Sequence, residues 1–256
     1  MIKQNQEYFT KTAETYESHD YWREDEEALV EKYFTDKRAR LLVLGCGGGR
    51  TLIPLHKKGY QITAIDIVPA MVDATRNRLA QASITDVEVL QMDAAHLTFT
   101  DKTFDYVFFP FHGIDYVEPD IYAAVKEVAR VLRDDGVFIF NSHNRLFIKQ
   151  LKKILRPYAE YEGLLTYRTW PLDTLHLRRY FGRVKTVARI SLQPWNKSNW
   201  KDIVYKIIPA LSKSTYFICS HPVRKLARIK NESTSTITLP IPGKAVEAPI
   251  MHNRRK

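Results

Sequence analysis

Glycines and acids that follow apolar segments are the residues of this chain best suited to holding a ligand. The run 41–44 (Leu-Leu-Val-Leu) leads directly into the glycine-rich segment 45–49, and a helical pattern follows over 50–59. Glycines let the chain turn sharply and let a ligand approach the bare backbone, and the start of a helix offers unpaired N–H groups. Asp66 ends the next apolar segment about twenty residues past Gly45, where an acid accepts hydrogen bonds from ribose hydroxyls. This spacing predicts a nucleotide or nucleoside site.

Arg50 narrows the kind of ligand. The dinucleotide-binding fingerprint has its third glycine where this chain carries Arg50, which argues against a bound pyrophosphate. The segment therefore predicts a nucleoside without a diphosphate. The simpler interpretation, that the glycines only form a turn, stays open at this point.

Two histidines are the candidate catalytic residues. His112 lies in the segment 110–116, and His143 lies in the segment 141–144. A histidine side chain titrates near neutral pH and can remove a proton from a reacting hydroxyl. Asp115 is a candidate for orienting such a base, as is Tyr116. The alternative for either histidine is a hydrogen bond to a backbone carbonyl and no part in catalysis.

The elements that must position these residues alternate between strand and helix. This alternation is typical of an α/β fold with a doubly wound, mostly parallel sheet (Rossmann-like), in which ligands bind at the carboxyl ends of the strands. The predicted strands are 41–44, 59–66, 87–92, 104–109 and 137–140, and the predicted helices are 24–34, 50–59, 69–82 and 121–133, the last ended by Asp134-Asp135-Gly136.

The C-terminal half is expected to add a cap and to complete a seven-stranded sheet with an antiparallel last strand. Residues 144–158 form a basic amphipathic pattern, predicted to pack on the sheet or over the substrate mouth, with membrane-surface binding as the alternative. The further expectations are a strand or cap at 161–170, a helix at 172–181, a closing antiparallel hairpin of strands 184–190 and 214–219, and Trp195, Trp200 and Tyr205 in the cap core or substrate wall.

Composition allows an ordinary globular core. The chain has 256 residues, of which 45% are hydrophobic, and its two cysteines, Cys46 and Cys219, belong to no zinc-type pair. Such cysteine usage is typical of the reducing cytoplasm. The N-terminus lacks the apolar core of a signal peptide, and no stretch is long enough to span a bilayer, so we expect a cytoplasmic protein and no metal site.

The net charge of +10 alone would favour nucleic acid or an anionic surface as a partner. Its distribution weakens that interpretation, because eight basic residues and only two acids lie in 221–256. Over half of the excess charge therefore belongs to the C-terminal end, where a basic tail is usually solvated.

Taken in order, the motifs resemble those of the class I S-adenosylmethionine-dependent methyltransferases, in the small-molecule branch that is similar to the quinone methyltransferases. The resemblance covers residues 8–145 and rests on five features in the family's order. They are the glycine loop 44–49, Asp66, Met92-Asp93-Ala94, Leu97-Thr98-Phe99 before Phe104-Asp105, and the segment 127–136.

The resemblance implies S-adenosylmethionine as the cofactor. It implies that Asp66 accepts hydrogen bonds from the ribose hydroxyls and that the glycine loop faces the methionine part. It also implies that the adenine lies beside Ile67 and Met71, with Asp93 at the edge of the ring. The cofactor-binding residues implied in this way are Tyr16, Gly45, Cys46, Gly47, Asp66, Ile67, Met71, Met92, Asp93, Ala94 and Phe109.

On this resemblance the chain divides into four parts. Residues 1–40 are expected to form an N-terminal helical lid, and 41–145 the cofactor-binding core. Residues 146–220 would supply cap helices and the last two strands of the same domain, and 221–256 a basic, mobile tail.

Val43 departs from the family. The family usually carries an acid two residues before the first glycine, and a valine there removes a negative charge near the ammonium group of the cofactor. This departure lends some support to a non-catalytic partner protein that kept the fold.

The leading hypothesis is methyl transfer to a hydroxyl or amine of a small molecule, such as a sugar, an amino sugar or a secondary metabolite. The basic charge motivates methylation of RNA or DNA as an alternative. Base-amine methyltransferases typically carry Asn or Asp, two prolines and an aromatic after the fourth strand, whereas this chain has Phe109-Pro110-Phe111-His112. The small-molecule hypothesis therefore fits the sequence better.

Overall fold

The computed structural model describes residues 3–17, 22–117, 121–144, 158–161, 164–167, 169, 173–188 and 214–224. Its centre is a seven-stranded sheet in the order β3-β2-β1-β4-β5-β9-β8. Strand β9 runs antiparallel to both of its neighbours, β5 and β8, while β1 to β5 pair in parallel. The predicted fold class is confirmed. The strands are β1 (Arg40–Leu44), β2 (Gln61–Asp66), β3 (Glu88–Gln91), β4 (Phe104–Phe109), β5 (Leu132–His143), β8 (Phe181–Ala188) and β9 (Ser214–Pro222).

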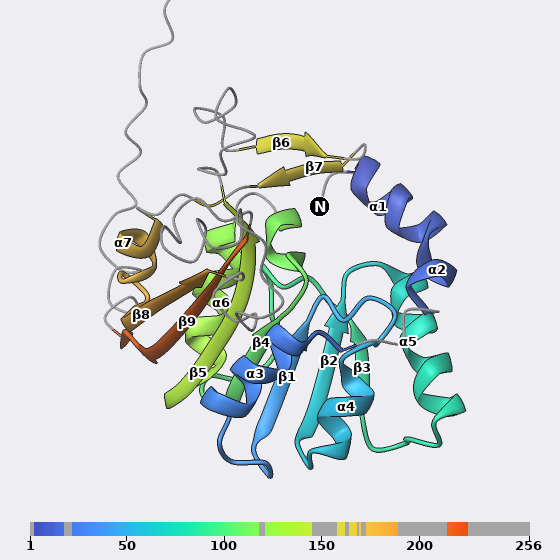
Figure 1. Ribbon diagram of the computed structural model, residues 1–256, viewed down its shortest axis with the longest axis horizontal. Helices are drawn as coiled ribbons and strands as arrows, with labels where there is room; N and C mark the ends of the chain where they lie inside the picture. The colour runs from blue at the N-terminus through green and yellow to red at the C-terminus, as the bar shows by residue number, and fades with distance from the viewer. Residues whose placement is uncertain are drawn as a thin grey trace, which may run out of the picture. The chain divides into compact units, whose positions relative to one another are not determined.

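Helices cover both faces of the sheet (Figure 1). Strand β1 shows why, since Leu42 and Leu44 pack into one hydrophobic cluster, and Leu41 and Val43 pack into the other. The described helices are α1 (Lys3–Lys11), α2 (Ala13–Glu17), α3 (Glu24–Tyr33), α4 (Leu52–Lys57), α5 (Pro69–Gln81), the 3₁₀ turn η1 (Gly113–Tyr116), α6 (Ile121–Val131) and α7 (Asp173–Leu177).

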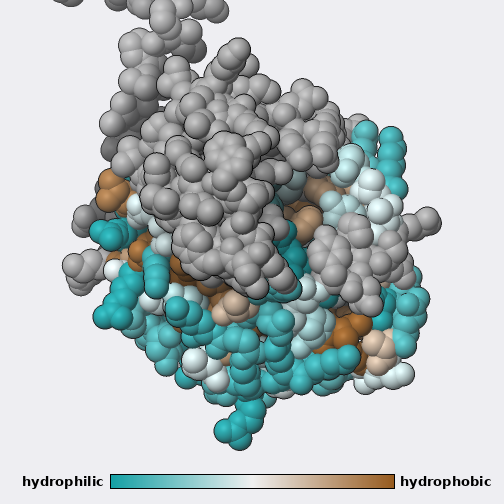
Figure 2. All heavy atoms as spheres, viewed as in Figure 1, coloured by the Kyte–Doolittle hydropathy of each residue, from teal (hydrophilic) through white to brown (hydrophobic). Residues whose placement is uncertain are grey.

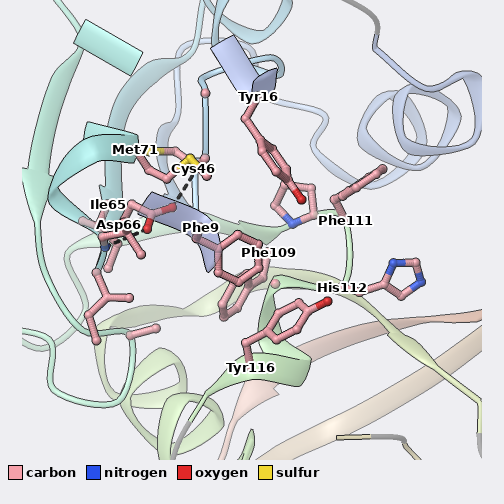
Figure 3. A pocket seen from close by; sticks show the side chains of 18 of the residues that line it. Phe9, Tyr16, Cys46, Ile65, Asp66, Met71, Phe109, Phe111, His112 and Tyr116 are labelled. Atoms are coloured by element: carbon pink, nitrogen blue, oxygen red, sulfur yellow. Dashed lines mark hydrogen bonds between the residues drawn. The ribbon is translucent and has the colours of Figure 1, made fainter. Parts of the chain in front are cut away.

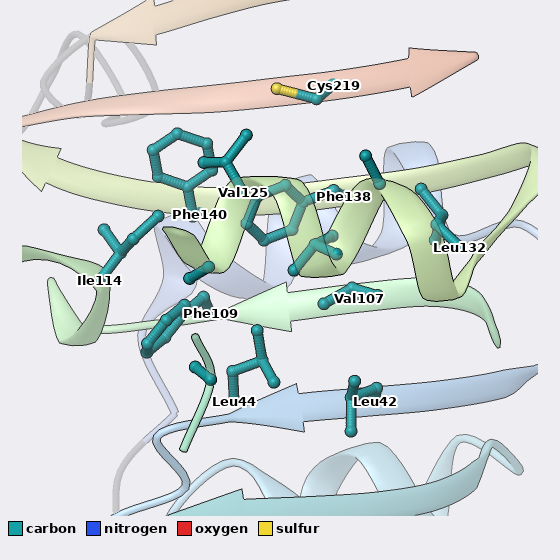
Figure 4. Close-up of a cluster of buried hydrophobic side chains, with 14 of the residues drawn as sticks. Leu42, Leu44, Val107, Phe109, Ile114, Val125, Leu132, Phe138, Phe140 and Cys219 are labelled. Atoms are coloured by element: carbon teal, nitrogen blue, oxygen red, sulfur yellow. The ribbon is translucent and has the colours of Figure 1, made fainter. Parts of the chain in front are cut away.

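The first cluster lies between the sheet and α6. Val125 of α6 packs with Phe138 and Phe140 of β5, and Cys219 of β9 is buried in the same cluster (Figure 4). The second cluster holds apolar residues of α3, α4 and α5 against the opposite face. Leu29 and Val30 of α3 are almost fully buried in this second cluster.

The prediction that residues 134–136 end the helix and precede the fifth strand is wrong. Helix α6 ends at Val131, and β5 already begins at Leu132, with a register shift against β4 between Phe104 and Tyr106. A Cβ added at Gly136 would lie only 2.8 Å from the carbonyl oxygen of Asp105, so glycine is needed there. The Asp-Asp-Gly signal therefore marks a bulge inside a longer strand.

The C-terminal half follows the predicted order with shifted boundaries. Helix α7 is shorter than predicted, and β8 begins at Phe181, which the sequence had assigned to that helix. The segment expected to be a strand or cap at 161–170 contributes to a hairpin of β6 (Tyr158–Tyr161) and β7 (Leu164–Tyr167). Strand β7 lies against α1 and η1, above the carboxyl ends of the parallel strands (Figure 1).

Several predictions fall outside the described residues. They concern the helix from 145 to 157, the aromatic residues Trp195, Trp200 and Tyr205, and the tail from 225 onward. Hydrophilic side chains cover most of the lower part of the face shown in Figure 2. Among the helices that the structure describes, none is long and apolar enough to cross a membrane.

Candidate functional site

A cavity of about 330 Å³ opens at the carboxyl ends of β1, β2, β4 and β5 (Figure 3). Every residue predicted from the sequence for the cofactor or for catalysis lines it. They are Tyr16, Gly45, Cys46, Gly47, Asp66, Ile67, Met71, Met92, Asp93, Ala94, Phe109, His112 and His143.

The glycine loop forms one wall through its backbone. Gly45 has a φ of +58°, and a Cβ added there would lie 2.7 Å from the ring of Phe109, so no other residue fits without a shift. Gly47 also has a positive φ, of +55°, and its carbonyl oxygen accepts a hydrogen bond from the hydroxyl of Thr75 on α5. Helix α5 therefore holds the loop in a shape that presents bare backbone to the cavity.

Asp66 ties the end of β2 to this loop. One carboxylate oxygen accepts the N–H of Gly47 at 2.9 Å, and the other accepts the N–H of Val68 at 3.0 Å. Burial raises the pKa of Asp66, whereas these backbone hydrogen bonds act to lower it. Each carboxylate oxygen can accept a further hydrogen bond. The side chain is therefore suited to a ligand with two neighbouring hydroxyl groups.

Apolar residues and a second acid continue this wall. Met71 is almost fully buried on α5, and it packs in one small cluster with Ile67 beside it. Asp93 follows β3, and one of its oxygens accepts the N–H of Ala95 at 2.9 Å, which fixes the side chain. Apolar faces with an acceptor at the edge suit a flat heterocycle that carries an amino group.

Cys46 lines the cavity and packs against α5. Its thiol is buried, and burial raises the pKa of the thiol, which disfavours the reactive thiolate. Its Sγ lies 3.5 Å from the hydroxyl of Thr75. Cys46 therefore helps to pack the loop.

His143 at the end of β5 forms a dyad with Asp115 of η1. The Nδ1 atom of His143 lies 2.8 Å from Asp115 Oδ2, which also accepts the backbone N–H of His143 at 2.9 Å. The hydroxyl of Ser142 donates to the other oxygen of Asp115. Burial raises the pKa of Asp115, whereas the hydrogen bond and charge of His143 act to lower it. With Nδ1 donating to Asp115, Nε2 is the nitrogen of His143 whose lone pair can accept a proton.

His112 is held differently. Its backbone has a φ of +61°, and its N–H donates to Asn141 Oδ1 at 3.0 Å. Its Nε2 atom lies 2.8 Å from the hydroxyl oxygen of Ser214, and its ring stacks on His143 with centroids 4.0 Å apart. The structure thus brings both predicted histidines together, but only His143 has a carboxylate partner among these contacts.

Aromatic rings from the N-terminal helices lie between the wall that carries Asp66 and the wall that carries the two histidines. The ring of Phe9 on α1 meets Tyr116 of η1 edge to face at 5.2 Å, and it meets Tyr16 on α2 at 6.0 Å. In Figure 3, Phe9 and Phe109 lie centrally, between Asp66 on one side and His112 on the other. Helices α1 and α2 therefore contribute to the wall of the cavity.

A charged group beside Phe111 was not predicted from the sequence. Arg23 pairs with Asp25, and Arg50 forms two hydrogen bonds of 2.7 Å with Glu26, which is fully buried. Both arginines line the cavity. The acidic start of α3 gives no sequence signal of burial, and the one available clue was the position of Arg50 directly after the glycine loop.

Val43 lies inside the sheet. Its side chain is fully buried in the cluster that faces α3 to α5, so a charged group at this position would be buried as well. Among the described residues that line the cavity, Asp66 and Asp93 are the acids.

The cavity fits the cofactor that the resemblance implies. Asp66 offers acceptor sites for a ribose, and the apolar wall at Met71 suits an adenine ring. The hydroxyl of Thr51, which also lines the cavity, is buried and has no hydrogen-bond partner among the described residues. A buried hydroxyl in this state is stabilised by a polar ligand atom, which either the cofactor or the methyl acceptor could supply.

Comparisons with known proteins agree with this arrangement. Residues 41–136 match the family model of a methyltransferase domain. The chain is 25% identical to demethylmenaquinone methyltransferase of Thermobifida fusca, with 73% of this chain and 80% of the relative covered. It is 28% identical to the uncharacterized methyltransferase YcgJ of Bacillus subtilis, with 54% of this chain and 55% of that protein covered. For several curated relatives the chain spans only about half of the relative's length.

A solved structure from Pyrococcus horikoshii OT3 superposes with a TM-score of 0.58 at 25% identity, and the match covers 77% of this chain and 88% of that one. A SAM-dependent methyltransferase from Methanosarcina mazei superposes with a TM-score of 0.56, and at 17% identity it supports the fold alone. The match covers 78% of this chain and 97% of that one. Together with the motifs and the sheet order, these findings show that residues 41–136 form a methyltransferase domain of the class I S-adenosylmethionine-dependent type.

Proposed function

We propose that this protein transfers a methyl group from S-adenosylmethionine to a hydroxyl or amine of a small molecule, and that His143 is the base. The observation that carries the proposal is the Asp115–His143 dyad, which lines the same cavity as Asp66. A sugar, an amino sugar or a secondary metabolite is the expected class of acceptor. A cytoplasmic location is part of the proposal.

In this proposal the β1–β2 side of the cavity, made of residues 45–47 and Asp66, holds the cofactor. Asp66 would accept hydrogen bonds from the ribose hydroxyls. Met71 and Ile67 would contact the adenine, and Asp93 would accept a hydrogen bond from the amino group of the adenine. The glycine backbone and Tyr16 lie beside the methionine part. Bound S-adenosylmethionine supplies a methyl group that is already activated by a positively charged sulfur.

The β4–β5 side, made of Phe111, His112 and His143, would hold the acceptor. His143 Nε2 would take the proton that the acceptor hydroxyl loses when it is methylated, with S-adenosylhomocysteine as the other product. The carboxylate of Asp115 would accept a hydrogen bond from Nδ1–H and stabilise the positive charge that His143 gains. His112 stacks on this ring and limits its rotation.

The aromatic rings serve to exclude water. Phe9, Tyr16 and Tyr116 surround the space between the two sides, and an enclosed site favours the acceptor over water as the group that is methylated. That α1 and α2 open and close as a lid remains a proposal. The relative from Thermobifida fusca is named for a demethylmenaquinone acceptor, and an aromatic lining here suits an acceptor that carries a ring.

The proposal is tested by offering the protein S-adenosylmethionine and a panel of sugars, amino sugars, phenols and amines, with mass-spectrometric detection of a gain of one CH₂. Bulk tRNA and ribosomal RNA form a second arm. Methylation of a small molecule that is lost in His143→Ala is the expected result. Methylation of RNA alone would overturn the small-molecule assignment, and failure to bind S-adenosylmethionine would overturn the enzymatic one.

A further inference from the structure

A second polar group lines the cavity and takes no part in the mechanism above. Arg23 and Arg50 lie over the ring of Phe111, with their guanidinium carbons 5.8 Å and 4.8 Å from its centroid. Thr51 follows Arg50 and lines the same cavity. We call Arg23, Arg50 and Thr51 the arginine corner.

The charges of the arginine corner are arranged in a fixed direction. Both arginines line the cavity, whereas their partners Asp25 and Glu26 are not among its described lining residues. The carboxylates therefore lie behind the guanidinium groups, with each pair held by two hydrogen bonds. Asp25 is fixed further by the hydroxyl of Tyr216, at 2.9 Å. Such oriented pairs present their positive ends to a ligand, which favours a negatively charged group.

Thr51 supplies an independent observation. The residue is 1% exposed, and in the described part of the chain its hydroxyl finds no hydrogen-bond partner. An unsatisfied buried hydroxyl is costly, so its presence in a cavity wall points to a ligand atom that completes it. A ligand atom that accepts hydrogen bonds and lies beside Arg50 would suit both Arg50 and Thr51.

The ring that both arginines contact belongs to the β4–β5 side, because Phe111 follows β4. Phe111 has a φ of +55°, which is rare for an aromatic residue, and His112 next to it also has a positive φ. Residues held in such conformations gather at functional sites, where the surrounding structure offsets the strain. In Figure 3, Phe111 and His112 lie on the opposite side of the cavity from Asp66.

We propose that the arginine corner binds a carboxylate group, and that the methyl acceptor carries it. The inference rests on the proposed function, since only then does an acceptor enter the cavity. The amino-acid part of the cofactor carries the same chemical group and is the other source. The contact of both arginines with the ring of Phe111, on the β4–β5 side, favours the acceptor.

The test measures ligand binding by calorimetry and needs no turnover. Para-hydroxybenzoate and para-hydroxybenzamide are matched probes that differ in charge, and both are titrated in the presence of saturating S-adenosylhomocysteine. The wild-type protein is expected to bind the acid about tenfold more tightly than the amide. Thr51→Val removes the hydroxyl at constant volume and should reduce this preference, and Thr51→Ser should keep it.

A second pair of ligands separates the two sources. S-adenosylhomocysteine has the amino-acid carboxylate, and methylthioadenosine lacks it. If Thr51→Val weakens only S-adenosylhomocysteine, the corner binds the carboxylate of the cofactor. If neither ligand pair responds to Thr51→Val, the inference is overturned.

The double variant Arg23→Gln/Asp25→Asn removes both members of an ion pair, so no buried charge is left alone. It should also weaken binding of the acid more than binding of the amide. Thermal unfolding serves as the folding control, and Thr51→Val should be at least as stable as wild type because it removes an unsatisfied group. Absence of methyl transfer together with an intact preference for the acid would sink the proposed function and the assignment of the carboxylate to a methyl acceptor, and would leave only the carboxylate site standing.

Discussion

The two sides of the cavity are built in different ways. On the β1–β2 side the contacts are short in sequence, since Gly47 and Asp66 are 19 positions apart, and the glycine loop presents its backbone. On the β4–β5 side the contacts are made by side chains from distant segments. His112 and Ser214 are 102 positions apart, and Asp25 and Tyr216 are 191 apart. A nearly continuous stretch of chain thus forms one side, whereas the other depends on the complete fold.

The two sides differ in how readily their ligand specificity can change between related proteins. A backbone loop with one acid tolerates changes in the surrounding side chains and suits a cofactor that a whole family shares. A network of charged side chains changes with each substitution and suits a ligand that differs between relatives. The two sides should therefore respond separately to mutation.

The sharpest separation is expected for His143→Ala. If His143 is the base, turnover should fall by about 10²- to 10⁴-fold, while the affinity for S-adenosylhomocysteine stays the same. His112→Ala is the matched control and should lower turnover less, also without changing that affinity. Turnover that is insensitive to His143→Ala would show that His143 is not the base and that the β4–β5 side does not supply it.

Asp66→Ala should show the opposite pattern. Loss of hydrogen bonds to a charged acceptor costs about 1.5–3 kcal/mol, so the affinity for S-adenosylhomocysteine should fall by about 10- to 100-fold. Asp86→Ala provides the control, because Asp86 is exposed and lies outside the cavity. Equal affinities of wild type and Asp66→Ala, measured by calorimetry, would show that the β1–β2 side does not hold the ribose.

Asp115→Asn tests positioning within the dyad. The amide keeps the shape but loses the charge that stabilises protonated His143, so we expect kcat to fall by about tenfold or more with KM little changed. Thermal unfolding shows whether the variant is folded. An increase in KM with unchanged kcat would mean that Asp115 serves acceptor binding instead.

The smallest expected effect is the pH dependence of cofactor binding. Burial raises the pKa of Asp66 above its ordinary value of 3.8, and bound ribose hydroxyls favour the ionised carboxylate. Protons therefore compete with the ligand, and the affinity for S-adenosylhomocysteine should be constant near neutral pH and fall as the pH drops through this raised pKa. Asp66→Ala should lack this fall. A wild-type affinity that stays flat down to about pH 4 would contradict the prediction.

Much of the β1–β2 side is predictable because its signals are local. A four-residue apolar run, the glycines that follow it and Asp66 at the next strand end define both the elements and the ligand type. The boundaries were less predictable at β5, where Asp134-Asp135-Gly136 has the composition of a turn but forms a bulge held in the sheet. Propensity there is overridden by pairing with β4.

The β4–β5 side could be predicted only in part. His112 and His143 stand at strand ends and are found by residue type, but which of them pairs with a carboxylate depends on how η1 packs against β5. The burial of Asp25 and Glu26 depends on Tyr216 and Arg50, and no local pattern reveals it. Long-range side-chain contacts of this kind are absent from sequence periodicity.

A crystal structure with S-adenosylhomocysteine bound tests the central claim most directly. We expect the ribose hydroxyls within hydrogen-bond distance of Asp66 and the adenine beside Asp93. The sulfur should face the side of the cavity that carries His143. A ligand whose ribose lies away from Asp66, or whose sulfur is shielded from His143, would contradict it.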